Sequence, residues 1–417
     1  MLVQLAKLLN NLTNPSKLKT HPLKGEFLLY RYDIIILLRK NDIMKKQLLA
    51  LFILSALTAC AGEGVSIDIK INPLANNIEI HSDLVKEWYA QESYDYKDMN
   101  AYVNAKTDQG DNLPLHFSWN VENLKEDEKV SYNVTFIASD GGIDGNYITD
   151  KNEIDFINYK INMKYTMNVS IMDGDKVKSE ANYEFTTPQG LVRTITVDGV
   201  SNFRDLGDGV HMKQGLLYRS TTLVNNTIED EDHPTMISEL GKEQLKQLHF
   251  VSHLDLRKDE EKGTNEPAII KKVIPAPLYY GGQNILTYKN SEYDNPATIK
   301  IIFTMLSDPS NYPCDIHCVR GTDRTGCIAY LIKGLLGFDE EALYRDYLFS
   351  NFYNIGSPVK LENIYYGTNP NATTKYVNVI HQAEGDTLQE KIYNYLLSDK
   401  IGVSKENLDR LIQFLKA

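Results

Sequence analysis

The sequence has little cysteine, no long apolar run and no excess of positive charge, and each shortage excludes a class of protein. Four cysteines in 417 residues exclude a disulfide-stapled scaffold, and no group of residues has the spacing of a zinc ligand set. A net charge of −12 without a basic stripe argues against nucleic acid as a partner. The chain is long enough for two folded domains, and we expect it to use neither a metal nor a cofactor.

The amino-terminal residues are typical of an export signal. Residues 1–43 are net basic and unlike the rest of the chain, whereas Met44 opens a Met-Lys-Lys-Gln segment that leads into the apolar run Leu48–Leu57. That run is well short of the ~20 residues that a membrane-spanning helix needs. We therefore expect residues 44–59 to be a signal peptide and residues 1–43 to be an over-extended start, with a genuine cytoplasmic extension as the alternative.

The segment Leu57-Thr58-Ala59-Cys60 resembles a bacterial lipobox, because small residues stand directly before the cysteine. The resemblance implies that the signal is cut before Cys60, that its sulfur carries lipid, and that residues 60–65 are an anchor linker. The expected location is the bacterial cell envelope, outside the cytoplasm and held to a membrane by this lipid. An ordinary signal peptide or a membrane anchor with a chance cysteine is the alternative.

The next part of the chain has the period of β-strands. Apolar and polar residues alternate in three segments, Leu115–Val121, Val130–Phe136 and Met167–Ile171. Asp173-Gly174 predicts a hairpin turn after the last of them. We expect residues 66–187 to form a small all-β sandwich, immunoglobulin-like or fibronectin type III-like and of unknown partner, and residues 188–194 to be a linker.

An acidic stretch from Asp140 to Asp150 lies inside this part of the chain. Its carboxylates invite a calcium interpretation, but their spacing does not fit the loop pattern for that ion. We expect a solvated turn here.

From residue 195 onward, strand and helix signals alternate. The expected elements are a strand over Phe250–Leu256 and helices over Pro296–Ser307, Asp339–Asn351 and Ser404–Lys416. Mixed strands and helices of this kind predict an α/β domain over residues 195–417, with a central sheet flanked by helices.

One short stretch of this domain carries the chemistry. Cys318 and Arg324 have five residues between them, after a predicted strand over Pro313–Ile316 and before a predicted helix through Cys327–Ile332. A strand, a tight loop and a helix start aim backbone N–H groups and the positive end of the helix dipole at one spot. That field favours a thiolate, and an arginine fork can hold two oxygens of a phosphate. The pattern therefore predicts a phosphate-transfer site.

His317-Cys318, five residues, Arg324 and Thr325 resemble the signature of the cysteine-dependent protein tyrosine phosphatase superfamily. Three further stretches are similar to the bacterial group of tyrosine/serine phosphatases within it, namely Asn202–Gly207 with Gly215–Ser220, Leu254–Arg257, and Asp346–Asn351. Together they extend over residues 195–417 and imply the α/β phosphatase fold.

The resemblance implies roles for the loop residues. Cys318 would attack phosphorus, Arg324 would hold the equatorial oxygens, and Thr325 would hydrogen-bond the sulfur. Asp323 would be the acid that protonates the leaving oxygen, with Asp294 as an alternative. The expected substrate-binding residues are Val319, Arg320, Gly321, Thr322 and His317, of which His317 is expected to fix the loop rather than touch substrate.

The loop departs from the group's pattern at two positions. Arg320 stands where a small residue is usual, and Thr322 stands where a lysine is usual. Losing the lysine weakens the case for phosphoinositides, whose several phosphates favour extra positive charge, unless the Arg320 side chain points into the pocket. Cys314 and Cys327 flank the loop, either as buried apolar side chains or as partners for an oxidised Cys318.

We therefore expect an enzyme, a protein tyrosine or dual-specificity phosphatase that hydrolyses phosphorylated protein through a cysteinyl-phosphate. An inositol polyphosphate or phosphoinositide phosphatase is the first alternative. Sulfur transfer or arsenate reduction is a second, against which the Arg-Thr-Gly ending argues. A non-catalytic phosphate-binding surface lipoprotein is a third, against which the intact set of Cys318, Asp323 and Arg324 argues.

Overall fold

The computed structural model describes residues 66–75, 77–91, 108–125, 128–174, 176–223, 237–261, 270, 272–280, 284–365, 367 and 374–417. The expected start, signal peptide and lipid-bearing Cys60 lie outside these ranges. The chain from Ser66 to Ala417 forms one compact unit. Within the described ranges, we find no helix whose length and apolar content would let it cross a membrane.

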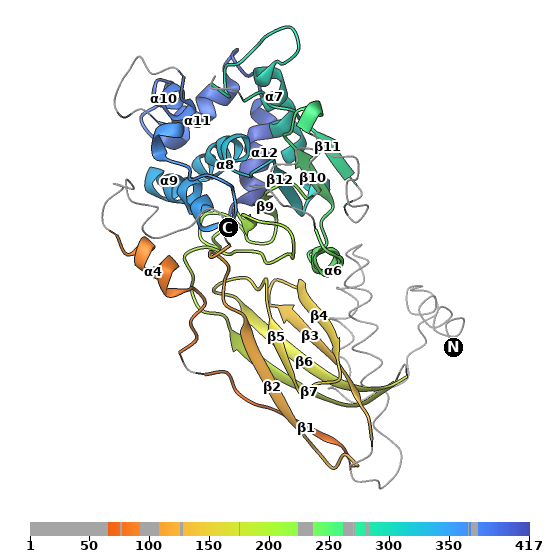
Figure 1. The fold of residues 1–417 in the computed structure, drawn as a ribbon. Helices are drawn as coiled ribbons and strands as arrows, with labels where there is room; N and C mark the ends of the chain where they lie inside the picture. The colour runs from red at the N-terminus through yellow and green to blue at the C-terminus, as the bar shows by residue number, and fades with distance from the viewer. Residues whose placement is uncertain are drawn as a thin grey trace, which may run out of the picture. The chain divides into compact units, whose positions relative to one another are not determined.

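The first seven strands form two antiparallel sheets that enclose one core (Figure 1). One sheet has the order β1 (Asp68–Ile71), β2 (Leu115–Glu122), β5 (Glu153–Phe156). The other has the order β4 (Ile143–Thr149), β3 (Ser131–Ala138), β6 (Lys164–Asp173), β7 (Lys176–Thr186). The rings of Phe136 and Phe156, one from each sheet, stack with centroids 3.9 Å apart. The three alternating segments are confirmed as strands, because their apolar residues point into this core.

The second part of the chain is built on a five-stranded mixed sheet. Its order is β11 (Lys272–Pro275), β10 (Ser252–Asp255), β12 (Cys314–His317), β9 (Leu217–Ser220), β8 (Arg204–Asp205). The first four strands are parallel, and β8 pairs with β9 in the antiparallel sense. The central strand β12 is buried along its whole length, as parallel sheets covered on both faces require.

Helices surround this sheet (Figure 1). The α-helices are α6 (Glu239–Gln247), α7 (Asn295–Leu306), α8 (Asp323–Leu335), α9 (Glu340–Leu348), α10 (Tyr376–His381), α11 (Leu388–Leu397) and α12 (Lys405–Leu415). Short 3-10 turns are η3 (Asp259–Glu261), η4 (Pro309–Asn311), η5 (Phe349–Phe352) and η6 (Leu361–Asn363). The three predicted helices are present as α7, α9 and α12, although the second is α-helical only to Leu348 and continues as the 3-10 turn η5.

A short helix that the sequence analysis did not predict joins the two parts. Helix α4 (Asp83–Tyr89) follows β1 in the chain, yet its Val85 and Trp88 are completely buried in the core of the mixed sheet. The Trp88 ring meets Phe352 edge-on at 5.5 Å, and the Arg345 guanidinium lies 5.5 Å from the centre of the same ring. We call the described residues 77–91 and 108–114 the strap, since they run from the sheet pair over the second part.

The strap is also fixed by buried polar contacts. Asp111 accepts hydrogen bonds from Thr196 at 2.9 Å and from Tyr353 at 3.0 Å. Burial raises the pKa of Asp111 to about 6, although both hydroxyl donors oppose that rise. The Asn112 backbone N–H donates to the Thr194 hydroxyl, its Oδ1 accepts the Thr194 N–H, and its side-chain amide donates to the Ile80 and Val192 carbonyls.

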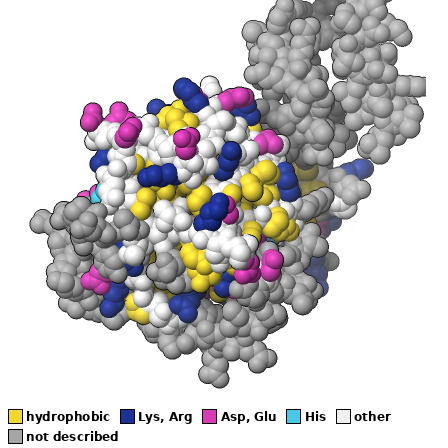
Figure 2. Space-filling view, turned by 90° about the horizontal axis from the view of Figure 1, so that it is seen from above, with side chains coloured by type: hydrophobic (Ala, Val, Ile, Leu, Met, Phe, Trp, Pro, Cys, Tyr) yellow, Lys and Arg dark blue, Asp and Glu magenta, His cyan; other side chains and the backbone are white. Residues whose placement is uncertain are grey.

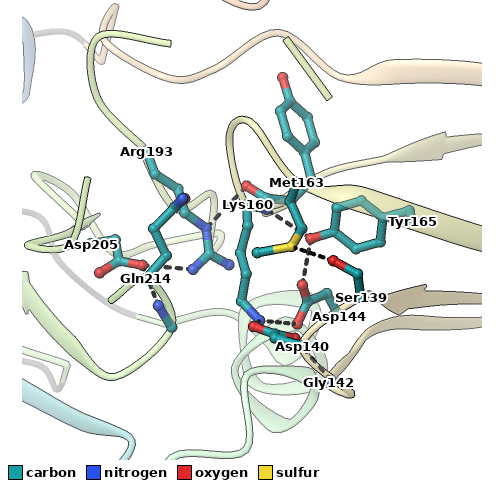
Figure 3. Close-up of polar contacts among 12 residues, drawn as sticks. Ser139, Asp140, Gly142, Asp144, Lys160, Met163, Tyr165, Arg193, Asp205 and Gln214 are labelled. Atoms are coloured by element: carbon teal, nitrogen blue, oxygen red, sulfur yellow. Dashed lines mark hydrogen bonds and ion pairs between the residues drawn. The ribbon is translucent and has the colours of Figure 1, made fainter. Parts of the chain in front are cut away.

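A second polar cluster lies where the loop after β5 meets the chain before β8 (Figure 3). The ammonium group of Lys160, which is almost fully buried, lies 2.6 Å from Asp140 and 3.5 Å from Asp144. Beside it, Arg193 donates to Asp205 at 2.7 Å. The expectation of a solvated turn over Asp140–Asp150 is therefore wrong in part: residues 139–141 do form an exposed turn, but β4 begins at Ile143, and Asp140 and Asp144 neutralise a buried lysine.

These contacts predict that the strap stabilises the second part of the chain. Replacing Trp88 by alanine leaves a cavity among aromatic side chains, so Trp88→Ala should lower the free energy of unfolding by about 3–5 kcal/mol. Urea unfolding followed by circular dichroism measures this. Glu87→Ala, on the exposed side of the same helix, is the matched control and should change stability by less than about 0.5 kcal/mol. Equal losses for the two variants would contradict the role of the strap.

The strap also predicts a pH dependence of stability. His81 accepts the Leu191 N–H at 2.8 Å, and burial lowers the pKa of His81 to about 4. A group whose folded-state pKa is depressed contributes stability above its unfolded pKa of about 6.5, and this is lost as pH falls towards 4. Between pH 7 and pH 5 we expect a loss of about 1–2 kcal/mol from this group.

His81→Gln keeps an acceptor for Leu191 but cannot be protonated, so its stability should fall less between the same two pH values. Urea midpoints of both proteins at pH 7 and pH 5 test the prediction. An identical drop in the two proteins would show that His81 does not titrate as described.

Candidate active site

The loop with the predicted nucleophile joins the central strand to a helix. β12 ends at His317, α8 begins at Asp323, and residues 318–322 form the turn between them. Gly321 has φ +67°, and a Cβ atom on it would lie 2.3 Å from the carbonyl oxygen of Ser220. Glycine is therefore required, because a larger residue would push the loop away from β9.

Three neighbours hold the carbonyl groups of the loop from outside. The Arg219 guanidinium donates to the Gly321 carbonyl at 2.5 Å, and the Asn202 side chain donates to the Arg320 carbonyl at 3.1 Å. The Thr222 N–H donates to the Val319 carbonyl at 3.1 Å. With its carbonyls turned outward to these donors, the loop has its N–H groups left to face an anion.

A buried carboxylate on α9 fixes two of the arginines involved. Asp346 lies 2.5 Å from Arg219 and 3.2 Å from Arg204, and Lys333 approaches it at 3.6 Å. Burial alone would raise the pKa of Asp346, but the three cations hold it well below its usual range. The motif residues Asn202, Arg204 and Asp346 therefore support the loop.

Arg324 is oriented by a residue that the sequence analysis did not single out. Glu261 accepts from both terminal nitrogens of Arg324, at 2.5 and 3.1 Å, and the Leu256 carbonyl accepts from Nη1 at 3.3 Å. Burial would lower the pKa of Arg324, but the Cys318 sulfur, and then Glu261 and Asp323, raise it. The structure thus brings the cysteine, the arginine and Asp323 together, with Arg324 Nε making no bond to a described residue.

His317 lies behind the loop and is closed off from substrate. Its Nε2 lies 3.0 Å from Nδ1 of His253, and its Nδ1 lies 4.0 Å from Asp255, which Arg257 holds through two hydrogen bonds. Burial lowers the pKa of His317 to about 3 and that of His253 to about 4, so both rings are neutral. His317 is therefore placed to fix the loop, and Asp255 with Arg257 braces it.

Asp323 is the first residue of α8 and lines a small pocket. Its Oδ1 accepts from the Tyr347 hydroxyl at 3.0 Å and its Oδ2 from the Thr322 hydroxyl at 3.1 Å. The pocket is lined by Tyr280, Ile285, Asp323, Asn363, Ile364, Thr374, Lys375 and Tyr376. Asp294, the alternative acid, instead caps α7 by accepting from the Ala297 N–H, and a hydrogen bond from Lys289 lowers its pKa.

The remaining predicted residues have distinct settings. Arg320 is partly exposed and donates to the Ser357 hydroxyl at 3.1 Å. Thr325 is completely buried, and its hydroxyl has no hydrogen-bond partner among the described residues, which leaves it available to the sulfur. Cys314 and Cys327 are buried and form no disulfide bond in the described part of the chain. Burial raises the pKa of the Cys314 thiol to about 12 and raises that of the Cys327 thiol further. Both therefore remain protonated thiols.

Sequence reasoning missed Glu261, Tyr280 and Tyr347 as residues of the site. Glu261 lies in an acidic run shortly after the strand end Asp255-Leu256-Arg257, and Tyr347 lies inside the Asp346–Asn351 motif. Their closeness to these motifs in the sequence could have identified both as candidates for the site. Tyr280 had no such signal. Over the described ranges, no cluster of three or more His, Cys, Asp and Glu side chains could hold a metal ion.

Comparison with known proteins places this geometry in a family. A protein of Cupriavidus necator, named as a candidate tyrosine-protein phosphatase, is 26% identical over 187 residues, which cover 38% of this chain and 64% of that protein. The chain thus spans a little under two thirds of that relative.

Two solved structures show weak likeness. TpbA of P. aeruginosa in complex with phosphotyrosine has 17% identity and a TM-score of 0.23, over 33% of this chain and 70% of that one. The catalytic core of Siw14 has 16% identity and a TM-score of 0.27, over 49% of this chain and 96% of that one. The model of the tyrosine phosphatase family matches residues 195–416, more than half of the sequence, and the chain therefore belongs to that family.

Proposed function

We propose that this protein hydrolyses phosphate monoesters, and protein phosphotyrosine in particular, through a cysteinyl-phosphate intermediate. The observation that carries the proposal is the loop after β12, which gathers Cys318, Asp323 and Arg324 at the start of α8. Backbone N–H groups, a helix start and an arginine fork are the donors that a phosphoryl group requires in its transition state.

The reaction has two steps. The Cys318 thiolate attacks phosphorus in line, forming an S–P bond as the P–O bond to the leaving group breaks, and protonated Asp323 gives its proton to the leaving oxygen. Water then attacks phosphorus, the S–P bond breaks, and the Asp323 carboxylate takes the proton from water. Arg324 holds the phosphoryl oxygens throughout, and Thr325 hydrogen-bonds the sulfur as it leaves.

The lining of the pocket favours an aromatic leaving group. Tyr280, Tyr376, Ile285 and Ile364 line a small pocket together with Asp323, and these side chains would pack against the ring of a phosphotyrosine beside the acid. Arg320 donates to Ser357, and neither residue lines the pocket, so we do not expect its charge to replace that of the missing loop lysine there. On the described part of the face in Figure 2, Lys and Arg side chains are interspersed with Asp and Glu side chains. Because the net charge is −12, we expect attraction of an anionic substrate to come from the loop and not from the whole molecule.

An inositol polyphosphate or phosphoinositide phosphatase is the second candidate. The observation that favours it is Lys375, which lines the pocket together with Asn363 and would supply one further positive charge to a second phosphate. A single lysine in a pocket with two tyrosines supports the phosphotyrosine assignment more strongly.

We also propose the setting of this activity. The lipobox-like segment before Cys60 supports a lipid-anchored protein of the bacterial cell envelope that acts outside the cytoplasm. The strand order β1-β2-β5 against β4-β3-β6-β7 supports an immunoglobulin-like or fibronectin type III-like sandwich over residues 66–187. Residues 195–417 would then be the catalytic domain, joined to the sandwich through the linker 188–194 and the strap.

The mechanism predicts which substrate turns over and which residue is indispensable. In EDTA-containing buffer, the protein should release phosphate from a phosphotyrosine peptide faster than from inositol hexakisphosphate. Cys318→Ser should abolish turnover, because a serine hydroxyl is not ionised at neutral pH. Malachite-green phosphate release measures both. Turnover that survives in Cys318→Ser would contradict the cysteine mechanism, and a preference for the inositol substrate would replace the phosphotyrosine assignment.

The two candidate acids make a matched pair of variants. Asp323→Asn should lower kcat on the phosphotyrosine peptide by about 10²–10⁴-fold, the usual worth of general acid catalysis. Asp294→Asn should leave kcat unchanged, because Asp294 serves as the cap of α7. Steady-state kinetics on both variants decides between them. A loss of kcat confined to Asp294→Asn would identify Asp294, and not Asp323, as the general acid.

A further inference from the structure

The hydroxyl of Tyr347, a buried side chain, reaches the proposed acid from α9. It belongs to α9, is 2% exposed, and donates to Oδ1 of Asp323 at 3.0 Å across 24 residues of sequence. The other oxygen, Oδ2, accepts from the Thr322 hydroxyl, the Tyr280 hydroxyl on the pocket wall also hydrogen-bonds the Asp323 carboxyl, and Asp323 itself lines the pocket. The two oxygens of one carboxyl group therefore differ in their surroundings.

The phenol can act only as a donor to this carboxylate. Burial raises the pKa of Tyr347 well above its usual value, and the neighbouring charge of Asp323 raises it further. Its hydroxyl proton therefore stays in place, and it directs Oδ1 inward as an acceptor. Oδ2 is left as the oxygen that carries the exchangeable proton on the pocket side.

The ring of Tyr347 is held in position by backbone and by its own helix. A Cβ atom on Gly326 would lie 3.0 Å from the Tyr347 ring, so the glycine after Arg324-Thr325 provides the space in which the ring packs. Asp346, the preceding residue on α9, is fixed between Arg204 and Arg219. The hydroxyl therefore starts from a rigid base, which a positioning group requires.

We propose that Tyr347 is a positioning residue that orients Asp323 as the general acid and fixes which of its oxygens delivers the proton. The inference rests on the proposed hydrolysis and extends it to a residue outside the catalytic loop. Tyr347 does not touch the substrate; it acts through Asp323. Its removal leaves the phosphoryl-binding groups intact but lets the carboxyl group rotate, so only the protonation of the leaving oxygen suffers.

The test uses leaving groups that depend on the acid to different degrees. In the full chain, Tyr347→Phe should lower kcat/KM for phenyl phosphate by about three- to tenfold, the loss expected for one hydrogen bond that orients the neutral carboxyl group. For 2,4-dinitrophenyl phosphate, whose leaving group needs no proton, the change should stay below about twofold. The variant therefore steepens the dependence of kcat/KM on the pKa of the leaving phenol.

Tyr353→Phe is the matched control. It also removes a buried phenol that donates to a carboxylate at 3.0 Å, but its partner is Asp111 in the strap. We expect it to cost comparable stability without changing the leaving-group dependence. A double variant, Tyr347→Phe with Asp323→Asn, should be no slower on phenyl phosphate than Asp323→Asn alone, because the tyrosine acts through the acid.

The outcomes separate this inference from the function on which it depends. If Asp323→Asn slows phenyl phosphate but Tyr347→Phe does not, the positioning role is refuted and the proposed function stands. Equal slowing on both substrates, or additive losses in the double variant, would also refute it, since a purely structural defect behaves in that way. If Cys318→Ser retains activity, the proposed function itself fails.

Discussion

The ion cluster at Asp346 is the interaction on which the catalytic loop depends. One buried carboxylate is shared by Arg219, Arg204 and Lys333, and Arg219 continues to the carbonyl of Gly321. A buried charge destabilises the folded state unless it is paired, so each of these groups is stable in its position only while the others are present. Removing one partner would leave the rest uncompensated, which explains why residues far apart in the chain act as one support.

The strap extends that support to the amino-terminal sheets. Arg345 is the neighbour of Asp346 on α9, and its guanidinium lies over the ring of Trp88 and donates to the carbonyl of Gln91 at 2.9 Å. Helix α9 therefore contacts the strap through Arg345 and supports the loop through the next residue, Asp346. Because Trp88 lies in the same core as the mixed sheet, the sheet pair is joined to the catalytic part by packing and not by the linker alone.

The sequence predicted what short-range rules decide. The strand and the helix around Cys318 follow from the local hydrophobic period, and the strands of the first sheets follow from strict alternation. Helix α4 was missed because seven residues give too little period to read. The contact between Arg324 and Glu261, and the outward turn of Arg320, depend on partners 63 and 37 residues away, which no local pattern encodes.

Asp346 and Tyr347 together show why the acid and the anion site keep their geometry. Successive residues on a helix point about 100° apart, so one residue of α9 reaches the arginine that braces Gly321 while the next reaches Asp323. Gly321 and Asp323 stand two residues apart where the loop meets α8, and a displacement of α9 would move both supports at once. The anion-binding loop and the proton donor Asp323 are therefore both held by helix α9. Asp346 and Tyr347, which lie outside the loop, set the position of one relative to the other.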